Sequence, residues 1–190
     1  MDDLIIAAIR RRLKTKPTDL GLLPRTRLIP AKEGDIASDE EHLRFRLPPL
    51  LKRMYADVGN GGFGPGYGLI GLTNGVPDDT GKTAIAIYDL FRSDPELAWP
   101  DGLLPICHWG CAIYSCIDCY DPDFRMRIFD PNVHDGDGWT DAFFAESPRF
   151  EDWIRSWASG VNLRDAMYGD SGHITRILSA RREGREQTDF

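Results

Sequence analysis

The sequence lacks the features that mark several large classes of protein. Its 190 residues contain no apolar run close to the ~18–20 residues that a membrane-spanning helix needs. Residues 1–16, MDDLIIAAIRRRLKTK, begin with acids and place the basic cluster after the apolar part, which reverses the order of a secretory signal. We therefore expect a cytoplasmic protein with no membrane partner, whose cysteines stay reduced.

Catalytic signatures are missing as well. The four histidines share no motif, and neither a G-x-S-x-G nucleophile elbow nor an H-E-x-x-H pair occurs. The segment Asp130-x-Asn132-x-His134 begins like a calcium loop, but Asp135 stands where that loop needs glycine. We expect no enzyme, no catalytic residue and no bound cofactor. A small cysteine- or metal-dependent enzyme stays open as an alternative, because a cysteine and a distant histidine can meet in the fold.

A glycine-rich stretch runs from Asn60 to Gly71. Residues 66–71, GYGLIG, fit the G-x-G-x-x-G fingerprint of dinucleotide-binding proteins. That fingerprint follows a strand and opens a helix, whereas here a helix is predicted before it and the non-helical segment LTNGVPDD follows. We interpret these glycines as positions for tight turns and close backbone packing.

All four cysteines lie in residues 107–119, CHWGCAIYSCIDC, which suggests a metal site, a disulfide or a buried piece of sheet. On a strand Cys116 and Cys119 point to opposite faces, and Cys111 and Cys119 lie ~26 Å apart. The spacing of Cys111, Cys116 and Cys119 matches a plant-type iron–sulfur site, but no cysteine follows Cys119. We expect compact buried residues with no metal bound and with Asp118 facing outward, and a metal site and a disulfide stay open as alternatives.

Hydrophobic spacing predicts three amphipathic helices. A polar connection through about Glu41 separates the first two. In the third, Ser147 is the expected cap and Pro148 the first helical residue. The helices cover residues 3–13, 48–58 and 147–158.

Runs of β-branched and aromatic residues predict four strands, the first of which leads into a short helical turn at residues 89–92. The strands cover residues 83–88, 103–109, 112–120 and 125–130. We expect one domain over residues 1–169, with its core at about 40–160, and a charged C-terminal tail over residues 170–190.

Negative charge gathers in the middle of the chain. The formal net charge is −7, and residues 78–141 contain 13 Asp and Glu against 4 Lys and Arg. Direct binding of nucleic acid is disfavoured, because a phosphate backbone requires a basic surface. The acidic half is either an ordinary solvated surface or a docking surface for a basic partner protein.

Two segments in order resemble the SMI1/KNR4 family (SUKH superfamily). The first is LPPLLKRMY at 47–55 with VGNGGF at 58–63, Pro65 and GLIGL at 68–72, and the second is LPICHWGCAIYSCID at 104–118. The match spans about Leu47 to Asp130. The positions that match the family's scaffold are Asn60, Gly61 and Gly62 in the first segment and Trp109 and Gly110 in the second.

The resemblance implies an α+β fold, with a mostly antiparallel sheet and helices packed against it, and no known enzymatic chemistry. Bacterial members of the family are taken as immunity proteins of polymorphic toxin systems, and fungal members act in regulation through protein contacts.

We therefore expect a binding module that neutralises a cognate, basic toxin domain of nuclease or deaminase type by charge-complementary occlusion. A regulatory or scaffold protein without a toxin partner is the alternative. The partner-binding residues predicted from charge, exposure and nearness to turns are Asp78, Asp79, Asp118, Tyr120, Asp121 and Asp123.

Overall fold

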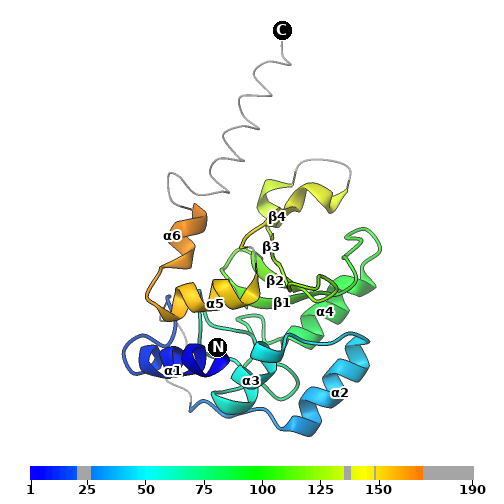
Figure 1. Ribbon diagram of the computed structural model, residues 1–190. Coiled ribbons are helices and arrows are strands. Elements are labelled where there is room, and N and C mark those ends of the chain that lie inside the picture. The colour runs from blue at the N-terminus through cyan, green and yellow to red at the C-terminus, as the bar shows by residue number, and fades with distance from the viewer. Residues whose placement is uncertain (21–26, 135–137, 148, 169–190) are drawn as a thin grey trace.

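The computed structural model describes residues 1–20, 27–134, 138–147 and 149–168. A four-stranded antiparallel sheet, in the order β1-β2-β3-β4, lies in the middle of the molecule, with α1, α2 and α3 below it in the view of Figure 1. The strands are β1 (Leu103–His108), β2 (Tyr114–Asp118), β3 (Met126–Phe129) and β4 (Phe143–Ala145). The helices are α1 (Asp2–Leu13), α2 (Glu33–Leu43), α3 (Pro49–Asp57), α4 (Ala84–Ser93), α5 (Phe150–Ala158) and α6 (Leu163–Tyr168), with 3-10 turns η1 (Pro131–Val133) and η2 (Trp139–Ala142).

This architecture confirms the predicted fold class, an α+β single domain with an antiparallel sheet. The three predicted strands between residues 103 and 130 are confirmed with shorter bounds, and the three-residue strand β4 was not predicted. None of the described helices is both long and apolar enough to cross a membrane. The predicted tail at residues 170–190 lies outside the described residues, so the domain boundary at residue 169 stays a prediction.

The sheet is covered on both faces where β1 and β2 run. Every residue of β1 is buried, which is typical of a strand packed on both sides rather than of one with a wet face. Pro105 sits at a register shift of this edge strand, where a proline is tolerated because no ladder hydrogen bond needs its missing N–H. The outer edge of β1 is itself covered, because the N–H of Ile70 donates to the carbonyl oxygen of Ile106 at 2.8 Å.

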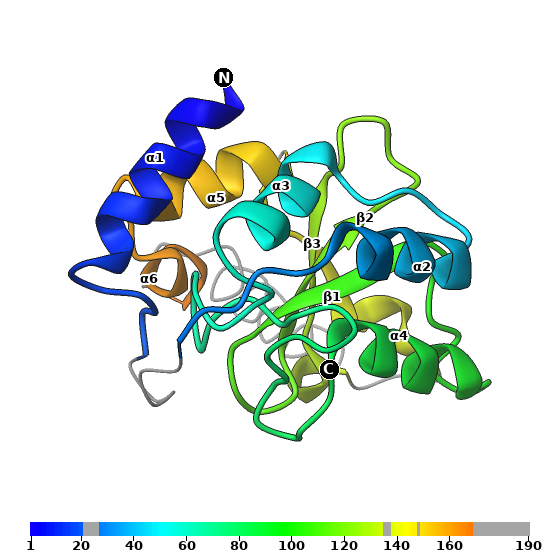
Figure 2. The same ribbon diagram turned by 90° about the horizontal axis from the view of Figure 1, so that it is seen from below.

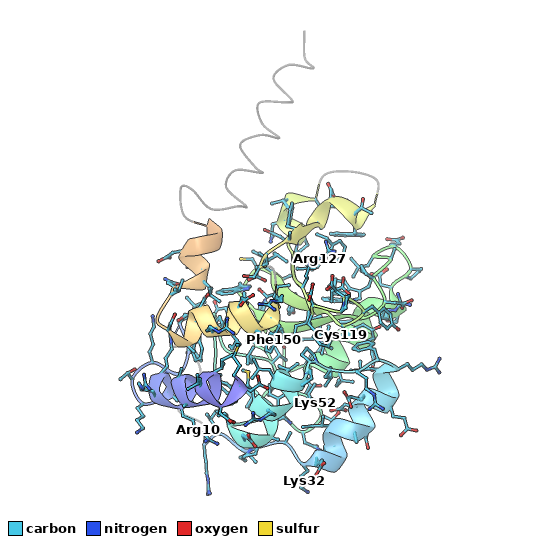
Figure 3. The ribbon with its side chains drawn as sticks, in the orientation of Figure 1. Arg10, Lys32, Lys52, Cys119, Arg127 and Phe150 are labelled. Atoms are coloured by element: carbon cyan, nitrogen blue, oxygen red, sulfur yellow. The ribbon has the colours of Figure 1, made fainter. Side chains whose placement is uncertain are left out.

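Helices α1 and α5 pack side by side, as both views show (Figures 1 and 2). The apolar spacing that predicted the last helix is confirmed in α5. Its buried residues are Phe150, Trp153, Ile154 and Trp157. Its predicted start is wrong: Arg149 is the N-cap and Phe150 the first helical residue, while Pro148 lies outside the described residues. Figure 3 shows Phe150 and Cys119 within the packed interior, whereas Arg10 and Lys32 project from the surface.

Two predicted elements are wrong. The segment Thr83–Tyr88 is not a strand but the start of α4, and the Thr83 hydroxyl accepts a hydrogen bond from the N–H of Ala86, as an N-cap does. The polar connection through Glu41 contains α2, whose buried face includes two carboxylates. The carboxylates of Asp39 and Glu40 accept hydrogen bonds from the N–H groups of Thr73 and Leu47. The inward face of α2 therefore carries charged residues, and the sequence shows no apolar stripe that would have predicted a helix.

Asn60 holds the glycine-rich stretch together. Its Oδ1 accepts the N–H of Leu72 at 2.8 Å and its Nδ2 donates to the carbonyl oxygen of Thr73 at 3.0 Å, and the residue is only 4% exposed. Gly61 has φ +82°, and a Cβ there would lie 2.5 Å from the nitrogen of Gly71. The stretch is therefore a turn wrapped around one buried amide, and the interpretation of its glycines as packing positions is confirmed.

Replacing Asn60 with alanine tests this account. The substitution leaves the N–H of Leu72 and the carbonyl of Thr73 without partners, so we expect Asn60→Ala to lower the free energy of unfolding by about 2–4 kcal/mol. The measurement is urea denaturation. Ser93→Ala, which removes an exposed hydrogen bond to the carbonyl oxygen of Leu90, is the matched control and should stay within about 0.5 kcal/mol of the parent. Equal effects of the two substitutions would contradict the account.

A buried chain of hydrogen bonds joins the sheet to α5. The Nε1 of Trp109 donates to the hydroxyl of Ser115 at 2.7 Å, and Ser115 is in turn hydrogen-bonded to the carboxylate of Glu146. The same carboxylate accepts the Nε1–H of Trp153 at 2.5 Å. Its Oε2 is buried without a hydrogen-bond partner among the described residues. Burial raises the pKa of Glu146 to about 7, although the hydrogen bonds from Ser115 and Trp153 act in the opposite direction.

The raised pKa of Glu146 predicts a pH-dependent stability. The folded protein holds a proton that the unfolded chain releases near pH 4.5, so the stabilisation is complete below that pH and is lost as the pH rises through about 7. Glu146→Gln keeps the acceptor for Trp153 but stays neutral. We expect the variant to gain about 2–3 kcal/mol of unfolding free energy relative to the parent as pH rises from about 5 to about 8. Denaturant titrations at each pH measure this difference, and a constant difference would contradict the prediction.

Candidate partner-binding site

The six predicted partner-binding residues fall into two groups. In the register of the β1–β2 pair, Asp118 faces Leu103 at one end and Tyr114 faces His108 at the other. At the first end, Asp118 is the last residue of β2, and Tyr120, Asp121 and Asp123 lie on the turn that follows it. Asp78 and Asp79 lie at the second end, against Tyr114 and His108. Since a strand rises ~3.3 Å per residue, the groups are separated by roughly the length of the hairpin and do not form one continuous patch.

The turn after β2 uses most of its negative charge internally. The Oδ1 of Asp118 accepts the N–H groups of Tyr120 and Asp121, at 3.2 and 3.1 Å. The Oδ2 atoms of Asp121 and Asp123 pair with Arg125, at 2.7 and 3.3 Å. These carboxylates shape the turn, so their charge is partly offset before any partner arrives.

Tyr120 is the exposed aromatic residue of this turn. The residue is 61% exposed, and its ring makes an edge contact with Phe45 at 5.9 Å between centroids. A Cβ on Gly102 would lie 2.7 Å from the Tyr120 ring, which shows how closely the ring lies on the backbone. The ring is therefore exposed and also held in place, which is how aromatic anchors at protein interfaces behave.

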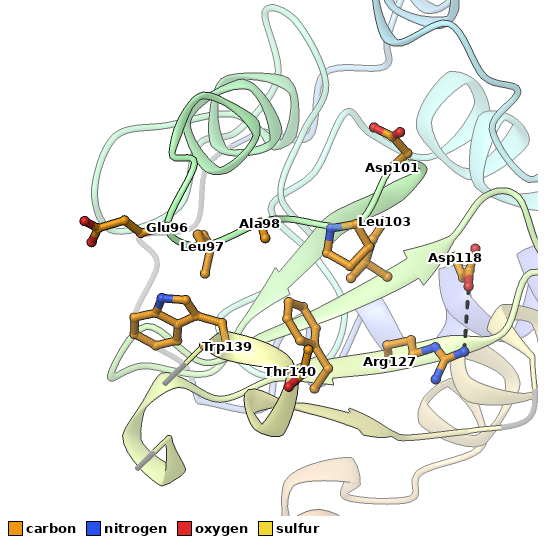
Figure 4. A pocket seen from close by; sticks show the side chains of 12 residues that line it. Glu96, Leu97, Ala98, Asp101, Leu103, Asp118, Arg127, Trp139 and Thr140 are labelled. Atoms are coloured by element: carbon orange, nitrogen blue, oxygen red, sulfur yellow. Dashed lines mark ion pairs between the residues drawn. The ribbon is translucent and has the colours of Figure 1, made fainter. Parts of the chain in front are cut away.

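A cleft of about 410 Å³ adjoins this turn. Figure 4 shows Glu96 and Trp139 at one end of it and the Asp118–Arg127 pair at the other, with atoms 3.9 Å apart. Most of its lining is apolar, and its rim has three carboxylates against one guanidinium. The apolar lining residues are Leu97, Ala98, Pro100, Leu103, Trp139 and Phe143, and the charged ones are Glu96, Asp101, Asp118 and Arg127.

The loop between α4 and β1 forms one wall of the cleft. It is held by hydrogen bonds between side chains and backbone atoms. The carboxylate of Asp94 accepts the N–H groups of Glu96 and Leu97, at 2.9 and 3.3 Å. Arg92 donates to the carbonyl oxygen of Trp99, and the buried Trp99 donates its Nε1–H to the carbonyl oxygen of Leu103 at 2.8 Å. The exposed side chains of Glu96 and Ala98 take no part in these hydrogen bonds.

Sequence reasoning found Asp118 but missed most of the cleft. Its lining comes from separate segments at 96–103, 118–127 and 138–143, and no local pattern connects them. One signal was available: Trp139 is an aromatic residue in the polar segment HDGDGWTD, where no core helix or strand needs it. In the structure Trp139 stacks on His134 at 4.3 Å between ring centroids and faces the cleft.

The cysteine segment is a hairpin of the sheet, as expected, with one exception. Cys107, Cys116 and Cys119 are buried, and burial raises the pKa of each thiol above its usual range. Cys111 is exposed, so the prediction of a buried residue is wrong there. It has φ +52° in the turn after Trp109 and Gly110, where the chain leaves the sheet. All four side chains are free thiols.

Thiol labelling tests this assignment. A thiolate is the reacting species, and the buried thiols are both shielded and held protonated. We therefore expect a disulfide reagent such as DTNB to modify one thiol per folded chain rapidly and all four after unfolding. Cys111→Ser should abolish the rapid reaction, whereas Cys119→Ser should leave it unchanged. Rapid labelling of a second thiol in the folded chain would be inconsistent with the packing.

At the other end of the hairpin, Asp78 and Asp79 meet His108. Tyr114 donates its hydroxyl to the Oδ2 of Asp78 at 3.0 Å, and the Oδ1 of Asp79 lies 2.8 Å from the Nδ1 of His108. Within the described part of the chain, these three residues form the group whose potential metal ligands lie within 4.8 Å of one another. It includes none of the cysteines.

The chain was compared with known proteins. The family model of the SMI1 / KNR4 family (SUKH-1) matches residues 30–156, which is more than half of the chain. The match includes the glycine-rich stretch, the sheet and most of α5. No curated protein matches with significant similarity.

Proposed function

The chain belongs to the SMI1/KNR4 family (SUKH-1), and from this membership we propose that it is an immunity protein that binds and neutralises a cognate bacterial toxin domain. The family is generally non-catalytic, and membership supports a protein-interaction role of the immunity type. Neutralisation by occlusion requires a surface and no catalytic group. The family match is the observation that carries this proposal.

The surface that we propose for the toxin is the cleft together with the adjoining turn. Three rim carboxylates surround apolar walls, and Tyr120 stands beside them as a held, exposed ring. Such a surface suits a partner segment that carries a lysine or arginine next to an apolar side chain. Enzymes that cut or modify nucleic acids need basic surfaces for the phosphate backbone, which an acidic protein complements.

Co-expression with the product of the adjacent gene tests the function. If that product is a toxin domain, we expect this chain to restore growth of the host and to co-purify with the toxin. Failure to restore growth, together with failure to co-purify, would contradict an immunity role. A stable complex with a non-toxic neighbour would instead support the regulatory or scaffold alternative.

A charge reversal at the rim tests the surface. Glu96 is exposed and has no ion-pair partner among the described residues, so Glu96→Arg should not disturb the fold. We expect it to weaken toxin binding about tenfold, and the loss should shrink as salt rises from about 50 to about 500 mM. Isothermal titration calorimetry measures both.

Glu33→Arg is the matched control, because Glu33 is also exposed but begins α2, at the opposite side of the molecule from η2 (Figure 1). It should bind the toxin as the parent does. Equal affinities for both variants would remove the cleft from the interface while leaving the immunity role intact.

A further inference from the structure

A second hollow of about 190 Å³ lies at the end of the β1–β2 hairpin away from the Asp118 turn. Asp78, Asp79 and His108 line it, together with Tyr67 and Pro77. It is separate from the cleft assigned to the partner and shares no lining residue with it. What it could bind is decided by its one imidazole and its two carboxylates.

The imidazole of His108 is buried without a hydrogen-bond partner. Its side chain is 5% exposed, and its ring packs against those of Tyr67 and Tyr114, at 5.8 and 4.8 Å between centroids. Neither ring nitrogen has a hydrogen-bond partner among the described residues. A buried polar group left without a partner is costly, so its presence calls for a ligand.

The contact between His108 and Asp79 does not supply that partner. The Oδ1 of Asp79 is only 2.8 Å from Nδ1, yet it lies off the line along which a ring N–H would donate. Two atoms that bind one Zn²⁺ at ~2.0–2.2 Å lie roughly 3–3.5 Å apart for bond angles of ~90–110°. The spacing of these two atoms is close to that of neighbouring ligands on one ion.

The carboxylate of Asp78 completes the group in a fixed orientation. Its Oδ1 accepts the N–H groups of Thr80 and Lys82 at 2.9 and 3.0 Å, and its Oδ2 accepts the hydroxyl of Tyr114. Hydrogen bonds of this kind orient the ligands of metal sites. Because Tyr114 also stacks on His108, one side chain positions two of the three groups.

Negative charge at this point has no protein cation to offset it. In the described ranges, no lysine or arginine lies within ion-pair distance of Asp78 or Asp79, and the nearby Lys82 reaches the hydroxyl of Thr80 instead. Two adjacent carboxylates beside an unpartnered imidazole therefore favour a bound cation. The mixed nitrogen and oxygen set suits Zn²⁺, since Mg²⁺ and Ca²⁺ prefer oxygen ligands alone.

We propose that Asp78, Asp79 and His108 bind one Zn²⁺ ion at the end of the β1–β2 hairpin, with a remaining position open to the hollow. The ion ties the loop that carries the two aspartates to the last residue of β1. This site is independent of the proposed partner surface.

Zinc titration of the full chain tests the proposal. After treatment with a chelator and dialysis, we expect calorimetry to show one Zn²⁺ per chain, and saturating Zn²⁺ to raise the melting temperature by several °C. Asp79→Asn is the informative variant, because the side chain is 55% exposed and can change without disturbing the core. It should bind Zn²⁺ at least about tenfold more weakly and lose the thermal shift.

His42→Ala is the matched control. His42 also contacts an aspartate, Asp89, at 2.9 Å, but both side chains are more than half exposed and no third ligand joins them. The control should keep parent-like zinc binding. An absence of zinc binding, an Asp79→Asn variant that binds as tightly as the parent, or a loss of binding in His42→Ala would each overturn the proposal and leave the Asp79–His108 contact as a simple ion pair.

Discussion

The amide of Asn60 connects the end of α3 to the segment that returns toward β1, and much of the molecule takes its position from that connection. Its two side-chain hydrogen bonds fix residues 72 and 73, and its carbonyl oxygen accepts the N–H of Val76 at 2.8 Å. The same segment covers the outer edge of β1 through Ile70 and then leads directly to Asp78 and Asp79. A side chain at Gly61 or Gly71 would clash with this backbone. Glycine is therefore required at these positions because the chain packs so closely around the Asn60 amide.

A second buried network of hydrogen bonds involves the other segment that resembles the family, residues 104–118. Trp109 donates to Ser115, Ser115 is hydrogen-bonded to Glu146, and Glu146 accepts the Nε1–H of Trp153 in α5. The network crosses from β1 to α5 through one carboxyl group whose raised pKa reflects its burial. Each of the two segments that resemble the family thus contains a place where polar side chains, in addition to apolar packing, fix the relative positions of elements distant in sequence.

Helices α1, α3 and α5 and strands β1 to β3 were predictable because their burial follows regular apolar spacing. Helix α2 was not, because its inward face includes Asp39 and Glu40, whose partners Thr73 and Leu47 are identified only by the fold. In α4 the apolar residues Ile85, Ile87 and Tyr88 suggested a strand, and the capping role of Thr83 was the overlooked signal. The proposed zinc ligands could not be found from spacing, since His108 comes from β1 and the aspartates from a loop about thirty residues earlier.

The wall of the cleft between α4 and β1 is held by the side chains of Arg92, Asp94 and Trp99, which bond to main-chain atoms of the loop. These atoms are the N–H groups of Glu96 and Leu97 and the carbonyl oxygens of Trp99 and Leu103. Every residue type has a carbonyl oxygen, and all except proline have an N–H, so the shape of this wall does not depend on which side chain Glu96 presents outward. Position 98 is less free, because Ala98 has φ +47°, where bulky or β-branched side chains are strained. For the proposed partner surface, this means that related chains can differ in partner by replacing Glu96 while keeping the same hydrogen-bonded framework. In this respect the loop resembles the variable loops of a binding scaffold.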